Sequence, residues 1–175
     1  MPMKARKITT TELRSKTIET LEERGITLHD IAEIVVTIQK RYSPDLTIDV
    51  AIHNILRVLQ KREVCNAILT GLALDKLAEQ NLLPSPIQEI IMSDEPLYGI
   101  DEVIPLSIIN IYGTIGFTSF GYLDKEKIGI IKKLDEMEDT VHTFADDIVC
   151  AIAAAAASRV AHRSRDIEDN VEKGS

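Results

Sequence analysis

The stretch that decides the fold of this chain is His142-Thr-Phe-Ala-Asp146-Asp147-Ile-Val-Cys150, which runs directly into Ala151-Ile-Ala-Ala-Ala-Ala-Ala157. The alanine run predicts a helix built for close packing, because alanine favours helix and leaves room for neighbouring backbones. Two adjacent carboxylates on the first turns of such a helix are costly to place near a core unless a positive charge neutralises them. A divalent metal ion is the usual candidate.

The same residues also have a purely structural interpretation. Thr143 is a candidate N-cap of this helix, with Asp146 at the third helical position, where a carboxylate satisfies free amides and complements the helix dipole. The run Ala153 to Ala157 is then a close-packed helix face or a contact between subunits. The sequence alone does not decide between the two interpretations.

The composition favours a single domain with an aliphatic core. The chain has 175 residues, three phenylalanines, four tyrosines and no tryptophan, and this length is enough to bury a sizeable core. Cys65 and Cys150 lie in apolar helical context without metal-ligand spacing, which predicts reduced core thiols. His53 and His142 have no partner at metal spacing either, so we expect surface or capping roles for them.

Charge and hydropathy exclude several classes of function. A net charge of −8 argues against nucleic acid as the partner, since phosphate backbones are met with Lys and Arg. The longest apolar candidate, residues 103–120, is interrupted by polar residues and glycines and falls short of the roughly 20 apolar residues of a membrane span. No cleavable signal, Gly-x-Ser-x-Gly motif, P-loop or dinucleotide fingerprint is apparent. We therefore expect a cytoplasmic protein, either soluble or peripheral at the inner membrane face.

Apolar residues recur at spacings of three and four along the first half of the chain, which is typical of amphipathic helices. Threonines precede these stripes at cap positions, and two of them have an acidic residue three positions later, as in a capping box. A Ser-Pro pair predicts a short fifth helix that ends near Met92. The predicted start signals are Thr9 with Glu12, Thr27 with Asp30, Thr47, and Ser85-Pro86.

The second half of the chain differs from the first in its amino-acid composition. Gly113, Gly116 and Gly121 are placed so that another backbone could approach closely, and a final helix is expected over residues 142–162. No run of period two is convincing, so the fold class is all-α, a single-domain helical bundle of about seven to eight helices. The expected segments are the amphipathic helices of residues 1–92, a second half over 93–163 that begins with a turn-rich hinge at 93–99, and a polar tail at 164–175 that frays.

Other acidic residues stand in glycine-rich or helix-start context. Magnesium accepts carboxylates from different segments and keeps several waters, so a shared site is chemically reasonable. The candidate metal ligands are Glu102, Asp124, Asp146 and Asp147. Lys127, three residues after Asp124, is placed to neutralise a phosphate oxygen. The alternative is that each acid begins or caps a helix by itself, Asp124 included.

These acids form three ordered elements that resemble those of a known family. The elements are Asp101-Glu102 in Gly-Ile-Asp-Glu-Val, Asp124-x-x-Lys127, and Phe144-Ala-Asp146-Asp147-Ile-Val-x-Ala151. In this order they resemble the phosphatidylglycerophosphatase A family, and the whole chain resembles its soluble branch, that of low-temperature-requirement protein C. The resemblance implies a magnesium-dependent phosphomonoesterase, with manganese as the alternative metal, that converts phosphatidylglycerophosphate to phosphatidylglycerol and phosphate.

The phosphatase hypothesis gives roles to individual residues. The metal activates water, Lys127 holds the phosphate, and either Asp101 or Asp146 is the general base. The chain departs from the family's membrane enzymes, because it has amphipathic helices in place of hydrophobic spans and lacks their Gly/Pro-rich segment. Lys127-Ile128 and Asp139-Thr140 stand where many members carry Lys-Pro and Gly-Gly. The expected substrate is therefore either a phospholipid reached by docking on the membrane or a soluble phosphate monoester.

A rival function comes from a different class of protein. The chain could retain the family fold as a non-catalytic interaction module that uses its alanine face and N-terminal helices for self-association. Stabilisation by magnesium discriminates between the two, since a ligand stabilises the state that binds it. In either case we expect a homo-oligomer, on the general tendency of soluble proteins.

Overall fold

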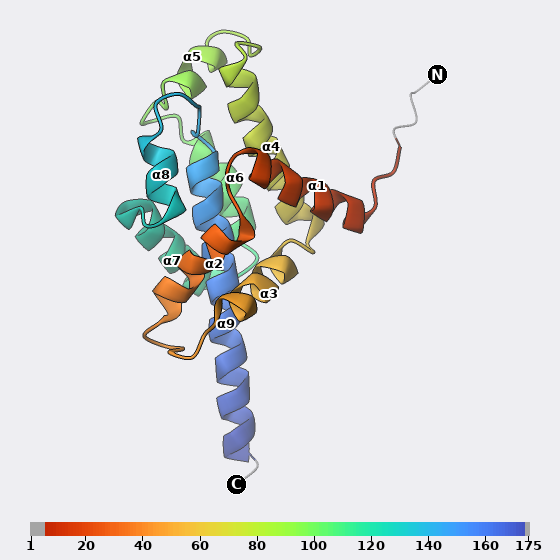
Figure 1. The fold of residues 1–175 in the computed structure, drawn as a ribbon, viewed down its shortest axis with the longest axis vertical. Coiled ribbons are helices and arrows are strands. Elements are labelled where there is room, and N and C mark those ends of the chain that lie inside the picture. The colour runs from red at the N-terminus through yellow and green to blue at the C-terminus, as the bar shows by residue number, and fades with distance from the viewer. Residues whose placement is uncertain (1–5, 174–175) are drawn as a thin grey trace.

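The computed structural model describes residues 6–173, and side chains over residues 6–164. The described range contains nine helices and no strand, and these helices form one bundle around α9 (Figure 1). The predicted all-α, single-domain bundle is therefore confirmed. The helices are α1 (Thr10–Glu23), α2 (Leu28–Gln39), α3 (Ile48–Val58), α4 (Arg62–Glu79), α5 (Ile87–Met92), α6 (Ile100–Ile109), α7 (Gly113–Glu126), α8 (Ile130–Glu136) and α9 (Ala145–Lys173).

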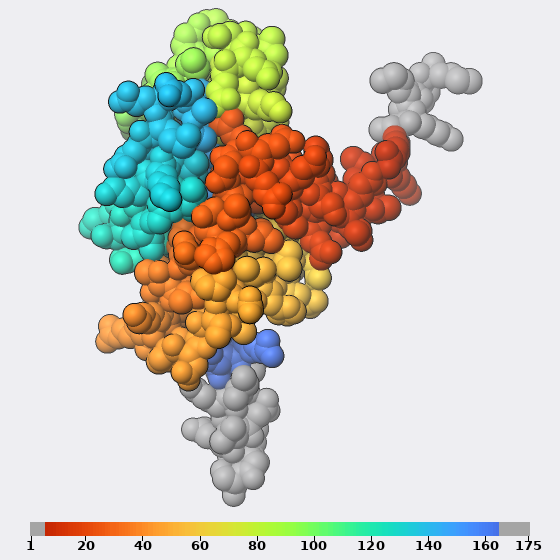
Figure 2. Space-filling model, in the orientation of Figure 1, coloured from red at the N-terminus to blue at the C-terminus, as the bar shows by residue number. Residues whose placement is uncertain are grey.

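Helix α9 is the centre of the bundle. Every residue from Val141 to Ser158 is buried, and a helix that is apolar on all sides is stable only inside a core. It packs against α2, α3, α4, α6, α7 and α8. In the space-filling view its described part emerges only near the C-terminal end (Figure 2). Because alanine side chains are small, many helices can pack around the axis of α9.

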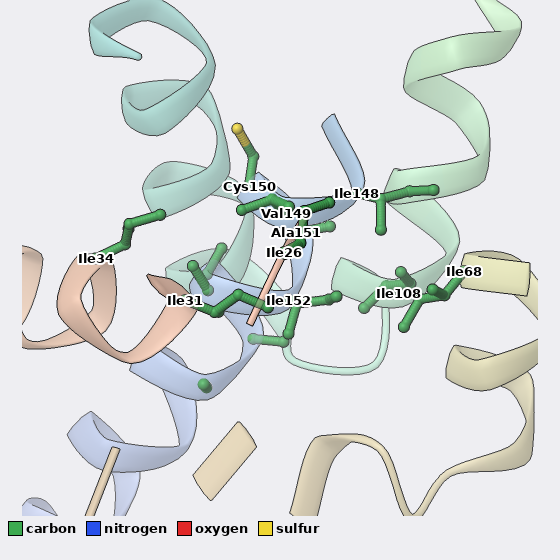
Figure 3. Close-up of a cluster of buried hydrophobic side chains, with 14 of the residues drawn as sticks. Ile26, Ile31, Ile34, Ile68, Ile108, Ile148, Val149, Cys150, Ala151 and Ile152 are labelled. Atoms are coloured by element: carbon green, nitrogen blue, oxygen red, sulfur yellow. The ribbon is translucent and has the colours of Figure 1, made fainter. Parts of the chain in front are cut away.

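The core is aliphatic, as the composition indicates. Isoleucines from several helices surround the start of α9. In Figure 3, Ile31 and Ile34 of α2 lie on one side of this helix, and Ile68 of α4 and Ile108 of α6 lie on the other side, toward which Ile148 points. Cys65 and Cys150 are both buried and free. Close packing of branched aliphatic side chains fixes where α9 begins relative to the helices around it.

The predicted helix starts are mostly confirmed. Thr9 with Glu12, and Thr27 with Asp30, each form a complete capping box, and Thr47 accepts a hydrogen bond from the Val50 amide. The glycine-rich segment forms two helices, and Gly116 lies at their crossing, where an added Cβ would come within 3.0 Å of Ile109 Cγ2.

Two predicted boundaries are wrong. Helix α5 begins at Ile87, with Pro86 at its N-cap and no capping bond from Ser85. Gln88 holds this turn instead, because its side chain accepts from the Leu83 amide and donates to the Ala78 carbonyl. The final helix begins at Ala145 rather than residue 142 and continues to Lys173, through the tail that was expected to fray.

Candidate functional site

The predicted acidic residues converge from three helices. Helices α6 and α7 form an antiparallel hairpin, so the first turn of α6 and the last turn of α7 lie at one end, beside the start of α9. Asp101 comes from α6, Asp124 from α7, and Asp146 and Asp147 from the first turn of α9. The carboxyl group of Asp147 lies close enough to those of Asp146, Asp124 and Asp101 for all three to raise its pKa. The bundle therefore brings these four carboxyl groups together.

Independent helix capping does not explain this convergence. Asp124 lies near the C-terminal end of α7, where the helix dipole disfavours a negative charge. Thr143 does not cap α9, because the amide of Asp146 donates to the His142 carbonyl, while the Thr143 hydroxyl donates to the Ile91 carbonyl at 2.6 Å. The capping interpretation is therefore wrong for Asp124 and Thr143. The other four acids, Asp101, Glu102, Asp146 and Asp147, do lie in the first turns of α6 and α9, as that interpretation expected.

Asp146 and Asp147 are buried, with 7% and 6% of their surface exposed. Burial raises the pKa of both carboxyl groups, because it penalises their charged forms. For Asp147, repulsion from Asp146 and Asp124 raises the pKa further. For Asp146, the neighbouring ammonium of Lys127 opposes the shift. Asp147 is thus the carboxyl of the pair that more readily keeps a proton when no cation is bound.

Lys127 brings positive charge to the group. It is the C-cap of α7, in the left-handed conformation with φ 46°, and its Nζ lies 2.8 Å from Asp135 Oδ1 and 3.2 Å from Asp146 Oδ2. Burial lowers the pKa of Lys127, but the bonds to Asp135 and Asp146 outweigh it, so the pKa lies above its ordinary value. One ammonium leaves the carboxylates with excess negative charge, which favours a further cation.

Sequence reasoning missed two carboxylates near this group. Asp94 follows α5 in a left-handed turn with φ 48°, and desolvation raises its pKa, with repulsion from Asp101 adding to the shift. Asp135 lies on α8 and pairs with Lys127. Asp94 lies in the segment 93–99 that was expected to be a hinge, and Asp135 lies in a charge-rich stretch of the sequence. Nothing in their local pattern distinguishes them from surface acids.

The start of α9 is capped by a residue from a distant helix. Asp75 of α4 is fully buried, and its carboxyl accepts the amide of Phe144 at 3.0 Å and the amide of Ala145 at 2.9 Å. These amides belong to the first turn of α9, which has no earlier helical carbonyl to bond. Asp75 therefore fixes the turn that carries Asp146 and Asp147.

Gly71 lies one turn before Asp75 and permits this approach. A Cβ added at Gly71 would stand 2.5 Å from Ile148 Cδ1 and 3.2 Å from Phe144 Cβ. Helix α4 can therefore lie directly against the first turns of α9 only with glycine at this position. The Gly71 and Asp75 pair was missed because its partners lie about seventy residues later in the chain.

A cavity of about 190 Å³ adjoins the acidic group. Asp94, Asp135 and Asp146 line it, together with His142. His142 is buried, so the expected surface role is wrong. Its Nδ1 lies 3.4 Å from the guanidinium of Arg24, which only donates, so the ring proton belongs on Nε2, 2.6 Å from Thr140 Oγ1.

The predicted ligands fit a cation that keeps several water ligands better than a cation coordinated by protein groups alone. Glu102 is exposed on the first turn of α6, and within the described residues no three His, Cys, Asp or Glu side chains stand in position to hold a metal ion by themselves. Magnesium usually binds one or two carboxylates and keeps several waters. The neighbouring carboxyl groups of Asp124 and Asp147, with Asp146 beside them, suit that mode. The full ligand set stays a prediction.

The buried carboxyl groups predict how stability depends on pH. Burial raises the pKa of Asp75 from 3.8 to about 8, although the amides of Phe144 and Ala145 oppose the shift. The native protein then holds protons that the unfolded chain has released between pH 4 and 8. The free energy of unfolding should therefore fall as pH rises through this window, by about 1.4 kcal/mol per pH unit for each carboxyl that stays protonated.

Urea unfolding in the presence of a chelator, at a series of pH values across this window, measures that slope. A free energy of unfolding that is constant or that rises between pH 4 and 8 would contradict the prediction. Addition of magnesium at pH 8 should recover stability, because a bound cation replaces the protons that buried carboxylates otherwise require.

Known proteins match this chain over most of its length. Residues 17–162 match the family model described as Phosphatidylglycerophosphatase A. The uncharacterized protein YpjQ of Bacillus subtilis (strain 168) is 58% identical over 164 residues, which cover 94% of this chain and 93% of that protein. YutG of the same organism is 56% identical over 158 residues, covering 90% and 95%.

Solved structures agree with the fold. The crystal structure of the low temperature requirement C protein from Listeria monocytogenes superposes with a TM-score of 0.86 and 53% identity, and the match covers 90% of this chain and 99% of that chain. The crystal structure of ypjQ from Bacillus subtilis gives a TM-score of 0.88 and 59% identity, covering 91% and 99%. Among the described residues, no helix combines the length and apolar character needed to cross a membrane.

Proposed function

The chain belongs to the phosphatidylglycerophosphatase A family, and on this premise we propose that it is a metal-dependent phosphomonoesterase. The observation that carries the proposal is the convergence of Asp101, Asp124, Asp146 and Asp147 beside Lys127. Carboxylates in excess over one ammonium would hold a divalent cation, and a cation beside a lysine is suited to a phosphate dianion. The adjoining cavity provides space for the ester.

The residues of the chain have distinct roles in this proposal. Asp124 and Asp147, with Asp146 and Glu102, would hold magnesium or manganese, which supplies positive charge against the phosphate oxygens when bound. Lys127 can donate to a phosphate oxygen in addition to its two carboxylate partners, because an ammonium has three donors. Either Asp101 or Asp146 accepts the proton of the attacking water. The cavity beside Asp146 would hold the alcohol of the ester.

The substrate proposed is phosphatidylglycerophosphate or a soluble phosphate monoester with a small polar alcohol. The carboxylates that line the cavity can accept hydrogen bonds from hydroxyl groups. The cavity volume of about 190 Å³ suits a polar head group and is too small for acyl chains. A phospholipid would therefore have to keep its chains outside, with the protein peripheral at the inner membrane face.

Two measurements test the function together. Magnesium should raise the melting temperature of the wild-type protein, and with magnesium or manganese present it should release phosphate from phosphatidylglycerophosphate in mixed micelles or from a panel of soluble phosphate monoesters. The lipid and soluble arms separate the two substrate classes. Metal binding without phosphate release from any ester would favour a non-catalytic module. A melting temperature that neither metal changes would contradict the proposed metal site.

A further inference from the structure

One long segment of the chain carries no charge although much of it is exposed. From Val103 to Leu123 there is no Asp, Glu, Lys or Arg, whereas 27% of all residues in the chain are charged. Within this segment Val103, Phe117 and Tyr122 are 57%, 42% and 54% exposed. An exposed apolar surface without charges is a common mark of an interface.

The exposed residues of this segment form one stripe along α7. We define the α7 stripe as Thr114, Phe117, Thr118, Gly121 and Tyr122, which are all exposed. Their spacings of three, one, three and one place them on one face of a helix. The opposite face of α7, with Gly116, Phe120 and Leu123, is buried in the bundle. The stripe is therefore the face of α7 left without a partner within the described chain.

Gly121 has no explanation within the described chain. Glycine in a helix interior is unfavourable relative to alanine, and Gly121 has neither a positive φ nor a neighbour within 4 Å of an added Cβ. Gly113 serves a turn and Gly116 a helix crossing, so they differ from Gly121 in this respect. Gly121 therefore leaves a gap on the α7 stripe, into which a side chain from outside the monomer can fit.

We propose that the α7 stripe is the face through which two copies of this chain associate. A twofold interface needs a self-complementary surface, and the stripe offers large aromatic rings beside a gap. In an antiparallel crossing of two α7 helices, Phe117 of each copy can occupy the space over Gly121 of the other. Each chain carries a net charge of −8, and this uncharged face is one on which two copies meet without direct repulsion.

A second copy suits the stripe better than a lipid surface does. Proteins that dock on anionic membranes surround an apolar patch with Lys and Arg. The charges that flank this segment in the sequence are Glu102 on one side and Asp124, Lys125, Glu126 and Lys127 on the other, so the flanks supply no excess of positive charge. The stripe therefore lacks the basic rim that favours an anionic bilayer, whereas its neutral centre accommodates an identical neutral face.

The test compares two matched threonine variants of the full chain. Thr118 and Thr70 are both exposed helical threonines whose hydroxyls donate to the carbonyl four residues earlier. In sedimentation velocity over a range of concentrations, the wild type should form a dimer. Thr118→Glu places two like charges at the interface and should raise the dimer dissociation constant at least about tenfold, whereas Thr70→Glu on α4 should leave it unchanged.

Gly121→Ala provides a second readout that separates folding from association. In the monomer the methyl group meets nothing, so the melting temperature at low concentration should rise, while the dimer should weaken because the close approach is blocked. A wild type that stays monomeric at high concentration would overturn the proposal, as would a dimer that Thr118→Glu leaves intact. Binding to neutral or anionic phospholipid vesicles that Thr118→Glu abolishes would assign the face to a membrane instead.

Discussion

Asp147→Asn should abolish the proposed phosphatase activity and at the same time stabilise the metal-free protein. Loss of a buried metal ligand should lower the rate of phosphate release by about a thousandfold, which corresponds to about 4 kcal/mol of transition-state stabilisation. The rise in melting temperature with magnesium should disappear. Without metal, the melting temperature at pH 8 should exceed that of the wild type, because a neutral amide does not have to bind a proton to remain buried.

The matched control for this variant is Asp49→Asn. Asp49 is also an aspartate in the first turn of a helix, but it is exposed on α3. It should leave phosphate release and the response to magnesium unchanged and should alter the melting temperature slightly. If Asp147→Asn lowered the metal-free melting temperature and retained the magnesium response, the carboxyl group would have a structural role in place of the proposed one.

Asp75→Ala should be the most destabilising of the single changes considered. It removes the acceptor for the amides of Phe144 and Ala145 and leaves both buried without a partner. Unsatisfied buried amides and a lost cap should together lower the free energy of unfolding by about 2–4 kcal/mol. Denaturant unfolding at pH 6, where the native carboxyl is largely protonated given its pKa of about 8, measures this difference.

Asp75→Asn is the informative comparison, because asparagine keeps one acceptor oxygen of nearly the same shape. Asp75→Asn should therefore retain much of the stability that is lost in Asp75→Ala. Asp30→Ala is a further control, since Asp30 belongs to an exposed capping box on α2 and its loss should cost about 1 kcal/mol. Equal costs for Asp75→Ala and Asp30→Ala would contradict the assignment of Asp75 as the buried cap of α9.

Local signals in the sequence predicted much of the fold. Capping boxes at Thr9 and Thr27 act within four residues, so their outcome does not depend on the rest of the chain. The fifth helix ends at Met92, as predicted, but it begins one residue later than expected, at Ile87, where the side chain of Gln88 reaches back to the Ala78 carbonyl. That contact is made across a loop and has no short-range pattern.

The residues of the candidate site were likewise predicted only in part from the sequence. Asp101, Asp124 and the Asp146-Asp147 pair were recognised because they form ordered motifs, and Lys127 was recognised with them. Asp94 and Asp135 were missed, because each is an ordinary surface acid until the bundle places it near Lys127 or Asp101. The sequence also offered Asp124 as a cap, which its place near the end of α7 rules out.

The sequence by itself determined that the run from Ala151 to Ala157 is a helix suited to close packing, because alanine favours helix and has a small side chain. Only the tertiary structure decided that this helix is the centre of the bundle and that Asp94 and Asp135 lie near its first turn. It also decided that Asp75 caps the first turn of α9 and that Gly71 permits the contact. The physical reason is that propensity and capping are properties of adjacent residues, whereas burial of a carboxyl group and its hydrogen-bond partners depend on which helices meet.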